Sequence, residues 1–524
     1  MARLGIDYGT TNTVVVGHDR GRYPLVPHVT ETAIGRVVRE VFPSLIVYDT
    51  GAGLLRFGAD AERCLVQPEA ERRFIPLRSL KRMLRDYVDG ARIATDLIPG
   101  GLDMGAVLEQ FAAAVHASVR ASGLMPPDEP LEAVLTLPAN ANGAQRHVTR
   151  RAFKAAGFDI IATLNEPSAA AIELADRLVH GDRLAARRLE TAVAVFDLGG
   201  GTFDTAVVGI NGTEYTVHSA SGIETLGGDD FDELLARLFA EKLKLDFDAL
   251  DHFHRTLLLI HACQQKERLS SGTVRNLTLD PEEIGLSGET CKVSTALFEK
   301  RLAERLAPAV DLLASVLDRA PLTFGAAGAR LGAIYLVGGS SRLPLVARLV
   351  AQRLPGIRLV NTDKPFTATA MGAAIHSAER ARVHDVFARH FGVIRLADHG
   401  TREYFAPIFR AGLRLPGDGE PPVVSEARYV PQHNIGHLRY LECATVNDDG
   451  TPAAGLRPWS DVLFPYDPSL PLTQRLTREQ IAPRSDPQGA EAVETYTCDR
   501  DGIIAVRIAR AADGQSRTFE IFKP

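Results

Sequence analysis

The pattern of hydrophobic and polar positions divides the chain into two parts of different texture. From residue 2 to about residue 380, short runs rich in β-branched residues alternate with longer amphipathic stretches of helical period. This alternation is typical of α/β folds built around a mainly buried sheet. Beyond residue 380 the apolar runs shorten, glycine and proline become frequent, as over residues 415–422, and no long helical period remains. The second part is therefore predicted to be all-β.

The change of texture also locates the joint between the two parts. Residues 380–390 contain few large aliphatic side chains and several charges, as expected of a segment between domains. We predict a first domain over residues 1–383, a linker over residues 384–391 and a β-sandwich domain over residues 392–524. A chain of 524 residues has room for such a multidomain organisation.

The α/β part contains an internal repeat. Residues 4–16 have the pattern of a strand ending at Asp7, a tight glycine-containing turn and a second strand, and residues 193–208 follow the same plan around Asp197. Two later pairs of segments repeat in the same order, residues 134–138 with 334–339 and residues 165–171 with 369–374. Two halves of common plan predict a cleft between them.

The two glycine-containing turns predict a polyphosphate site. A tight turn exposes successive backbone N–H groups, and glycine lets an anion approach the backbone closely. Thr10, Thr11 and Thr202 would add hydroxyl donors, while Asp7 and Asp197 would face the same place with negative charge. Carboxylates beside phosphates favour Mg²⁺, which is usually held by one or two carboxylates, waters and substrate phosphates. One such turn would more simply be a hairpin, but two with Asp and Thr at matching offsets favour the phosphate site.

Several other candidate residues have plain structural explanations by pattern alone. Lys81 lies in a basic run on a predicted helix, where a solvated face is the simpler interpretation. Glu166 precedes Pro167, and a carboxylate there is often a helix-start residue favoured by the helix dipole. The turn at residues 338–342 fits a nucleotide-binding wall or an ordinary strand-to-helix connection about equally well.

These motifs, in this order, resemble the 70-kilodalton heat-shock chaperones of the DnaK type, within the actin-like ATPase superfamily. The matching segments are residues 5–12, 137–140, 165–167, 196–204, 226–232 and 337–339. The resemblance covers nearly all of residues 1–380. It implies an α/β two-lobe ATPase domain with duplicated ribonuclease H-like lobes, followed by an all-β sandwich. It also implies ATP or ADP with Mg²⁺ as cofactors and slow hydrolysis of ATP to ADP and phosphate.

The resemblance also implies a role for individual residues. Asp7 and Asp197 would hold the hydrated Mg²⁺, and the catalytic residues would be Lys81, Glu166, Asp204 and Thr202. The implied nucleotide contacts are Thr10, Thr11, Asn12, Gly199, Gly200, Gly201, Thr202, Lys266, Ser270, Gly338, Gly339, Ser340 and Arg342. Pro138 and Arg146 match the switch that couples nucleotide state to the peptide domain in this family. Phosphoryl transfer needs mainly positioning and charge neutralisation, which such a set can supply.

The resemblance is fainter in the β domain, where residues 404–409 and 499–506 carry it. It implies a sandwich that binds unfolded or extended apolar polypeptide under nucleotide control, with Val393 and Leu396 as candidate peptide contacts. A slip of one residue in a strand would invert both side chains. Because the chain ends soon after its last predicted strand, we expect no helical lid over a bound peptide.

Some positions depart from the family pattern. Asn140, Gly143 and Ala162 stand where the family has residues that help to dock J-domain co-chaperones, which weakens the case for a J-domain partner and a nucleotide exchange factor. Cys263 and Glu267 replace a Glu and an Arg or apolar residue near the adenosine. They bear on nucleotide affinity and leave the catalytic residues in place.

Charge and cysteine usage exclude several classes of function. Lys and Arg number 59 against 65 Asp and Glu, which gives a net charge of -6, the wrong sign for a nucleic-acid binder. The five cysteines are scattered without metal-ligand spacing, and we interpret them as reduced core thiols of a cytoplasmic protein. The sequence contains neither a signal-peptide core at its start nor an apolar window of the roughly 18 residues that a membrane span needs.

Two other functions stay open beside the chaperone. One is a nucleotide-switched scaffold that docks a single dedicated protein partner, favoured by the expected lack of a lid. The other is a small-molecule kinase on the same two-lobe plan, which needs a carboxylate base where Lys81 is expected to lie. A kinase would have no use for the β domain.

Overall fold

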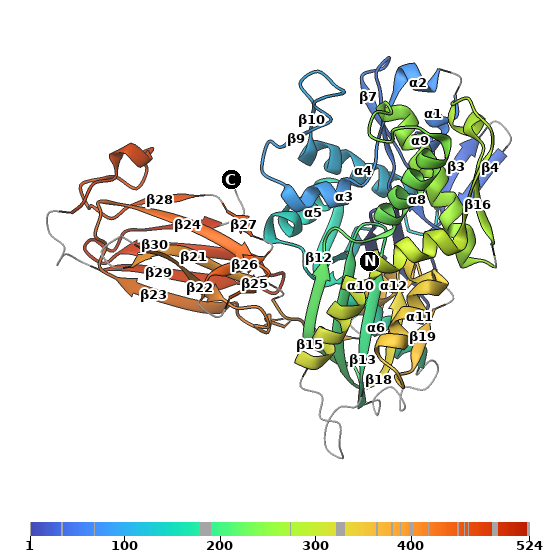
Figure 1. The fold of residues 1–524 in the computed structure, drawn as a ribbon. Coiled ribbons are helices and arrows are strands. Elements are labelled where there is room, and N and C mark those ends of the chain that lie inside the picture. Colours follow the sequence, from blue (N-terminus) through green and yellow to red (C-terminus); the bar gives the residue numbers. More distant parts are fainter. Residues whose placement is uncertain are drawn as a thin grey trace. The chain divides into compact units, whose positions relative to one another are not determined.

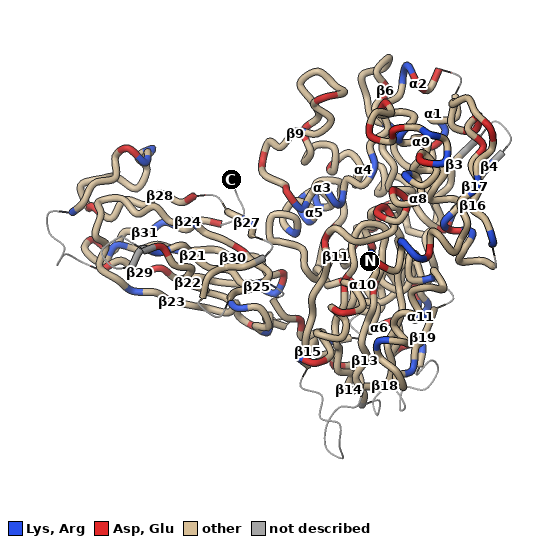
Figure 2. Tube along the Cα trace, in the orientation of Figure 1, with Lys and Arg blue, Asp and Glu red and all other residues tan. Residues whose placement is uncertain are grey.

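The chain forms two compact units (Figure 1). Unit 1 consists of Met1–Ala139 and Val148–Val383, and unit 2 consists of Asn140–His147 and His384–Pro524. The computed structural model describes residues 2–32, 35–67, 69–178, 190–272, 274–320, 331–362, 365–378, 381–387, 389–397, 402–417, 419–447, 450–454, 456–459, 461–484 and 491–520. Acidic and basic residues alternate along the chain of each unit (Figure 2), as the nearly balanced charge predicts.

The first glycine turn lies at the tip of a hairpin in a five-stranded sheet. The strand order of this sheet is β12-β11-β1-β2-β5. β1 (Ala2–Tyr8) pairs antiparallel with β2 (Asn12–His18) and parallel with β11 (Leu131–Leu137). β12 (Phe158–Asn165) continues the parallel side and β5 (Phe42–Pro43) forms the other edge.

The second glycine turn lies at the tip of the equivalent hairpin in a six-stranded sheet. β13 (Glu190–Leu198) pairs antiparallel with β14 (Phe203–Asn211) and parallel with β18 (Leu331–Val337). The order of this sheet is β19-β18-β13-β14-β15-β20, and its other strands are β15 (Glu214–Ile223), β19 (Leu359–Asn361) and β20 (Arg382–His384). A hairpin with a parallel neighbour therefore occurs in both sheets, in the order that the internal repeat predicts.

Two alanine-rich helices follow strands of the two sheets and pack closely against each other. They are α6 (Glu166–Leu178) and α12 (Ala368–Ser377). A Cβ atom on Gly372 would overlap the backbone of Ala169, so only glycine permits this crossing. The alanine-rich segments of the internal repeat thus have a packing reason, because small side chains let helix backbones approach.

The largest hydrophobic core of unit 1 lies between the six-stranded sheet and its covering helices. These helices are α8 (Gly228–Leu243), α9 (His252–Glu267), α10 (Thr295–Arg319) and α11 (Pro344–Arg353). Asp251 caps α9 and Ser294 caps α10 through side-chain oxygens that accept from backbone N–H groups. None of the described helices is long and apolar enough to cross a membrane.

The remaining elements of unit 1 complete the region around the first sheet and the periphery of the second. They are β3 (His28–Thr32), β4 (Gly35–Arg39), β6 (Ile46–Asp49), β7 (Leu54–Phe57), α1 (Gly58–Leu65), α2 (Ala70–Arg73), β8 (Phe74–Leu77), α3 (Leu80–Met83), β9 (Arg92–Ile93), β10 (Leu102–Asp103), α4 (Met104–Ala121), β16 (Asn276–Leu279), β17 (Cys291–Ser294) and the 3₁₀ turn η4 (Gly339–Arg342). α5 (Gly143–Ala155) begins in the segment that belongs to unit 2.

Two antiparallel sheets of unit 2 share one hydrophobic core, and β25 (Thr445–Val446) pairs with β26 (Pro452–Ala454) in a small third sheet. One sheet consists of β22 (Arg402–Phe409), β21 (His390–Ala397), β24 (Ile435–Cys443), β27 (Arg457–Pro458) and β28 (Val462–Pro465). The other consists of β23 (Val423–Tyr429), β29 (Ala492–Cys498), β30 (Ile504–Arg510) and β31 (Ser516–Glu520). From residue 384 onward the described residues contain no α-helix, which confirms the all-β prediction for this part.

The segment that we predicted as a linker packs into unit 2. The backbone N–H of Phe387 donates to the carbonyl of Leu413 at 2.8 Å, and the side chain of Phe387 lies in the core together with Phe391. The N–H of Leu415 donates to the carbonyl of Asp385, also at 2.8 Å. Although the segment contains charged residues, its two aromatic side chains, Phe387 and Phe391, pack in the core of unit 2.

Candidate functional site

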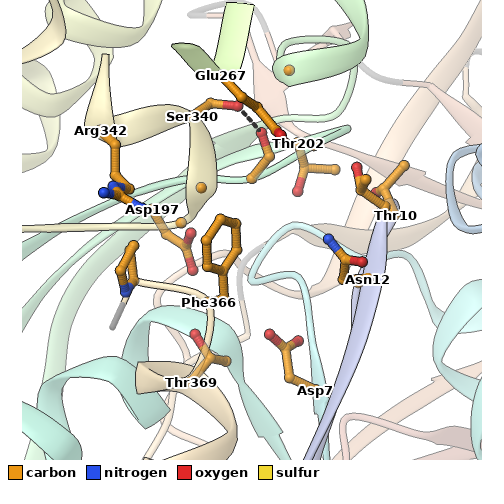
Figure 3. A pocket seen from close by; sticks show the side chains of 18 of the residues that line it. Asp7, Thr10, Asn12, Asp197, Thr202, Glu267, Ser340, Arg342, Phe366 and Thr369 are labelled. Carbon is orange, nitrogen blue, oxygen red and sulfur yellow. Dashed lines mark hydrogen bonds between the residues drawn. The ribbon is translucent and has the colours of Figure 1, made fainter. Parts of the chain in front are cut away.

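A cavity of about 350 Å³ lies in unit 1, with both glycine turns in its wall (Figure 3). Most of the predicted site residues line it, namely Asp7, Thr10, Thr11, Asn12, Lys81, Glu166, Asp197, Gly199, Gly200, Thr202, Lys266, Ser270, Gly338, Gly339, Ser340 and Arg342. Gly201 and Asp204 are not in the lining, although Gly201 lies between the lining residues Gly200 and Thr202, and Asp204 pairs across the hairpin with the lining residue Asp197. The fold thus brings together residues that are far apart in the sequence.

The two glycine turns lie directly against each other. A Cβ atom on Gly200 would collide with the hydroxyl of Thr11, and one on Gly201 would lie 2.6 Å from the hydroxyl oxygen of Thr10. The second turn is closed by the N–H of Gly199, which donates to the carbonyl of Thr202 at 3.0 Å. Glycine is required here because two hairpin tips occupy one small space, which leaves backbone N–H groups and threonine hydroxyls beside the cavity.

A buried ion pair forms the floor of the cavity. Nζ of Lys81 lies 2.6 Å from Oε1 of Glu166, and the two residues are 5% and 6% exposed. Burial by itself would lower the pKa of Lys81, but the charges of Glu166 and Asp7 outweigh it and raise that pKa. Lys81 therefore stays protonated. The pair joins two helices, because Lys81 belongs to the short helix α3 and Glu166 begins α6.

Two further carboxylates, of the partly buried Asp7 and the buried Asp197, give the cavity an excess of negative charge. Burial, and then the charge of Glu166, raise the pKa of Asp7 to about 6. Burial followed by Glu166 and Asp7 raises the pKa of Asp197 well above its usual value. One lysine cannot neutralise this group of carboxylates, so a bound cation would relieve the repulsion between them.

The donor set fits a magnesium ion that retains water. Asp7 already accepts a hydrogen bond from the hydroxyl of Thr136 at 3.0 Å, which orients its carboxylate. Within the described ranges no three His, Cys, Asp or Glu residues cluster as a complete metal site. Two carboxylates with waters and phosphate oxygens are the usual ligands of Mg²⁺, whereas structural zinc needs four protein ligands.

The opposite wall of the cavity is formed by α9 and by the turn η4. Nζ of Lys266 lies 2.7 Å from Oδ1 of Asp232 and donates to the carbonyl of Gly228 at 2.8 Å. Oγ of Ser340 donates to the carbonyl of Gly199 at 2.9 Å, which ties η4 to the second glycine turn. The side chain of Arg342 is exposed at the cavity. This wall offers flat backbone, hydroxyls and cations, which suits the nucleoside part of a nucleotide.

Some lining residues were missed or misjudged from the sequence. Phe366 lines the cavity although no motif marks it, and Thr369 lines it although the repeat segment 369–374 suggested no role for this residue in the site. Cys263 lines it too, and burial raises the pKa of its thiol to about 12. The prediction that all five cysteines are core thiols is therefore wrong for Cys263 and Cys291, which are partly exposed. The exposure of a cysteine depends on which face of α9 or β17 it occupies, and the amino-acid composition carries no information about that.

The other predicted residues lie away from the cavity. Pro138 follows β11, and Arg146 belongs to unit 2, where its Nε donates to the carbonyl of Ala141 at 3.1 Å. Val393 is 1% exposed and packs in the core of unit 2, so its side chain does not face solvent. The side chain of Leu396 lies outside the described residues.

Unit 2 also contains a buried polar network that the sequence did not reveal. Glu494 is 0% exposed and lies 2.7 Å from a guanidinium nitrogen of Arg395. The hydroxyls of Tyr429 and Tyr496 donate to the same carboxylate. A buried charge is tolerated when it is paired and hydrogen-bonded in this way.

Comparison with known proteins points to one family. The sequence profile of the family described as Hsp70 protein matches residues 117–387. The chaperone protein HscA homolog of Ralstonia nicotianae is 32% identical over 384 residues, which are 72% of this chain and 58% of that protein. The chaperone protein DnaK of Thermus thermophilus is 31% identical over 397 residues, 71% of this chain and 60% of its own length. The chain thus spans a little over half the length of these relatives.

Proposed function

This chain belongs to the Hsp70 family, and on that premise we propose that it is an ATP-binding and ATP-hydrolysing chaperone. We infer that unit 1 is the two-lobe, actin-like ATPase domain and that unit 2 is the β-sandwich that binds polypeptide. The observation that carries the proposal is the buried pair of Lys81 and Glu166, which lies with Asp7 and Asp197 at the two glycine turns.

The binding step uses groups that the cavity already presents. Backbone N–H groups of the turn at Gly199–Gly201 and the hydroxyls of Thr10 and Thr11 bind the phosphates. Asp7 and Asp197 would hold a hydrated Mg²⁺, which would neutralise charge on the phosphate oxygens.

The hydrolytic step depends on the position of a water molecule. The ammonium of Lys81 donates a hydrogen bond to the attacking water and holds it in line with the terminal phosphate. Glu166 keeps that ammonium in place through the contact of 2.6 Å. Asp204, which is buried behind the second turn, completes the polar group that assists the water. Positioning of this kind suffices because phosphoryl transfer requires little covalent chemistry from the protein.

The partner of unit 2 is proposed to be an unfolded or extended polypeptide with apolar side chains. Binding and release would follow the nucleotide state, with Pro138 and Arg146 in the coupling route. The alternative is one dedicated folded partner, for which the same nucleotide site would serve as a switch.

The test is ATP turnover by the purified chain with and without an excess of an extended apolar peptide. We expect slow, Mg²⁺-dependent turnover that rises with peptide and falls at least about a hundredfold in Lys81→Ala, a loss typical when a positioned catalytic group is removed. The control is Lys300→Ala, which removes an exposed lysine of α10 outside the cavity. The double variant Lys81→Ala/Glu166→Gln leaves no unpaired charge at this pair and should hydrolyse ATP no faster than Lys81→Ala.

The outcomes separate the candidate functions. Turnover that depends on Lys81 but is indifferent to every peptide supports the dedicated scaffold. A phosphorylated small molecule formed alongside ADP would support the kinase. Absence of ATP binding by the folded wild-type chain would overturn the proposal.

A further inference from the structure

An aromatic side chain lies on the η4 wall of the cavity. The ring of Phe366 packs edge-on against Gly339, so that a Cβ atom on that glycine would lie 2.5 Å from Cε1 and 3.2 Å from Cζ of the ring. The carbonyl of the preceding Pro365 accepts a hydrogen bond from the N–H of Gly338 at 3.3 Å. Figure 3 shows the ring of Phe366 among the labelled side chains of the cavity. The hydrogen bond of the preceding residue, Pro365, thus holds Phe366 against the glycine turn.

The exposure of Phe366 is unusual for a large apolar residue held in this way. The side chain is 38% exposed, and it is not among the residues of the main hydrophobic core of unit 1. An aromatic ring that lines a cavity offers its face to whatever planar group enters. If this wall bound only phosphate, a polar side chain would be more favourable here than an aromatic ring exposed to water.

The surroundings of Phe366 suit a flat heteroaromatic ring. Arg342, on the same turn as Gly339, is exposed, and among the described residues no carboxylate forms an ion pair with it. A guanidinium plane stacks on aromatic faces as readily as it pairs with anions. Glu267 at the end of α9 lines the same cavity but has no planar cation or apolar group to offer to a base. Leu343 and Pro365 add apolar surface here, but among the described residues that line the cavity Phe366 is the only aromatic one.

We propose that Phe366 is the base-stacking residue of this nucleotide site and makes it specific for nucleoside triphosphates over free polyphosphate. The inference depends on the proposed ATP-binding function and adds a residue that lies outside the motifs which identify the family. Stacking buries a face of the ring that is now exposed and holds the base beside Gly339, while the phosphates bind at the two glycine turns.

The experiment is isothermal titration of the full-length chain with MgATP and, separately, with magnesium tripolyphosphate, which has the phosphates but no base. In Phe366→Ala we expect the Kd for ATP to rise about tenfold, and at least fivefold, because an aromatic–base stack is worth on the order of 1–3 kcal/mol. The Kd for tripolyphosphate should stay within about twofold of wild type. Phe366→Trp keeps a stacking face and should bind ATP within about threefold of wild type.

Two controls keep the result interpretable. Leu97→Ala removes an apolar side chain of matched exposure, 37%, that does not line the cavity, and it should change neither Kd. Phe366→Trp adds a second indole to a chain whose single tryptophan is Trp459. ATP should quench the added fluorescence, whereas tripolyphosphate should not.

The possible failures are distinct. If wild type binds ATP and Phe366→Ala binds it equally well, the inference is overturned and the ATP site stands. If Phe366→Ala binds ATP more tightly, the ring obstructs the base and the inference is also overturned. If the folded wild-type chain binds neither ligand, the proposed nucleotide site fails and the stacking role fails with it.

Discussion

At the scale of single residues, the electrostatics of the cavity depend on Lys81. Its ammonium is the cation paired with Glu166, and the carboxylates of Asp7, Asp197 and Asp204 also act on it or on each other. Removal of one partner from a buried ion pair leaves the other charge without compensation. The pair of Lys81 and Glu166, which we propose to be catalytic, is therefore also a determinant of stability.

The double substitution at this pair is expected to be less harmful to stability than the single one. Lys81→Met should lower the free energy of unfolding of nucleotide-free unit 1 by about 3–5 kcal/mol, because it leaves Glu166 unpaired. Lys81→Met/Glu166→Gln should regain most of that loss, and neither variant should hydrolyse ATP. Urea unfolding at pH 7.5 checks this, and a single variant as stable as wild type would show that the pair is not coupled.

A second residue-scale prediction concerns pH. Burial lowers the pKa of His28 to about 4; its Nδ1 lies 2.9 Å from Oγ of Ser118, and its buried Nε2 has no hydrogen-bond partner among the described residues. The pKa of His28 is about 6.5 in the unfolded chain and about 4 in folded unit 1, so the unfolded chain binds the proton first as the pH falls. Stability from this residue is therefore complete above pH 6.5 and is lost as the pH falls towards 4.

The measurement compares wild type with His28→Gln, which cannot titrate. Between pH 7.5 and pH 4.5 the difference in unfolding free energy should shift by about 2 kcal/mol in favour of the variant. Urea unfolding of both chains at the two pH values gives this difference directly. An equal loss of stability in both chains would mean that His28 is protonated in the folded state.

At the scale of elements, ion pairs connect α3, and Arg78 just before it, with the start of α8. A guanidinium nitrogen of Arg78 lies 3.6 Å from carboxylate oxygens of Asp229 and Asp232, and Arg82 lies 3.0 Å from Asp230. These acidic residues also favour the N-terminus of α8 through its dipole. Because Lys81 on α3 and Asp232 on α8 both line the cavity, separation of the two helices would open it.

We expect these ion pairs to slow the release of nucleotide. Both arginines are partly exposed and each pair contributes roughly 0.2–1 kcal/mol, so Arg78→Ala/Arg82→Ala should raise the release rate about threefold to tenfold. The variant should also lose much of the acceleration that salt produces in wild type. Stopped-flow release of a fluorescent ATP analogue at several salt concentrations measures both effects.

The matched control for this prediction is Arg237→Ala. Arg237 also lies on α8, but its ion pairs are with Glu233 and Asp248 and do not reach α3. Its release rate should equal that of wild type. Equal acceleration in the control and in the double variant would show that general loss of charge, and not the connection between α3 and α8, sets the rate.

At the scale of the whole molecule, the division into two units predicts two unfolding transitions. Phe387 anchors the start of unit 2 in its core, so Phe387→Ala should destabilise that unit by about 3 kcal/mol. ATP is expected to bind unit 1 and should raise the midpoint of the other transition. Calorimetry of wild type and Phe387→Ala, each with and without MgATP, tests this prediction. A single transition whose midpoint shifts with both the substitution and MgATP would contradict it.

Much of the site could be predicted because its motifs are local. A strand that ends in Asp and a glycine turn followed by threonine are specified within about a dozen residues, at residues 4–16 and again at 193–208. The same holds for Glu166 at the start of a helix. The contact of Lys81 with Glu166 joins residues 85 positions apart, and by pattern alone Lys81 was better explained as part of a solvated face.

The sequence by itself determined the alternation of elements, the change to all-β texture near residue 380 and the repeated hairpins, because backbone preference and hydrophobic period act over short distances. Only the tertiary structure decided which side chains meet, as with Phe366 on Gly339 or the burial of Phe387 in unit 2. The same is true of Val393, whose inward direction follows from strand register. Register and packing are set by contacts between segments distant in sequence, and the hydrophobic period of one segment does not specify which other segment it contacts.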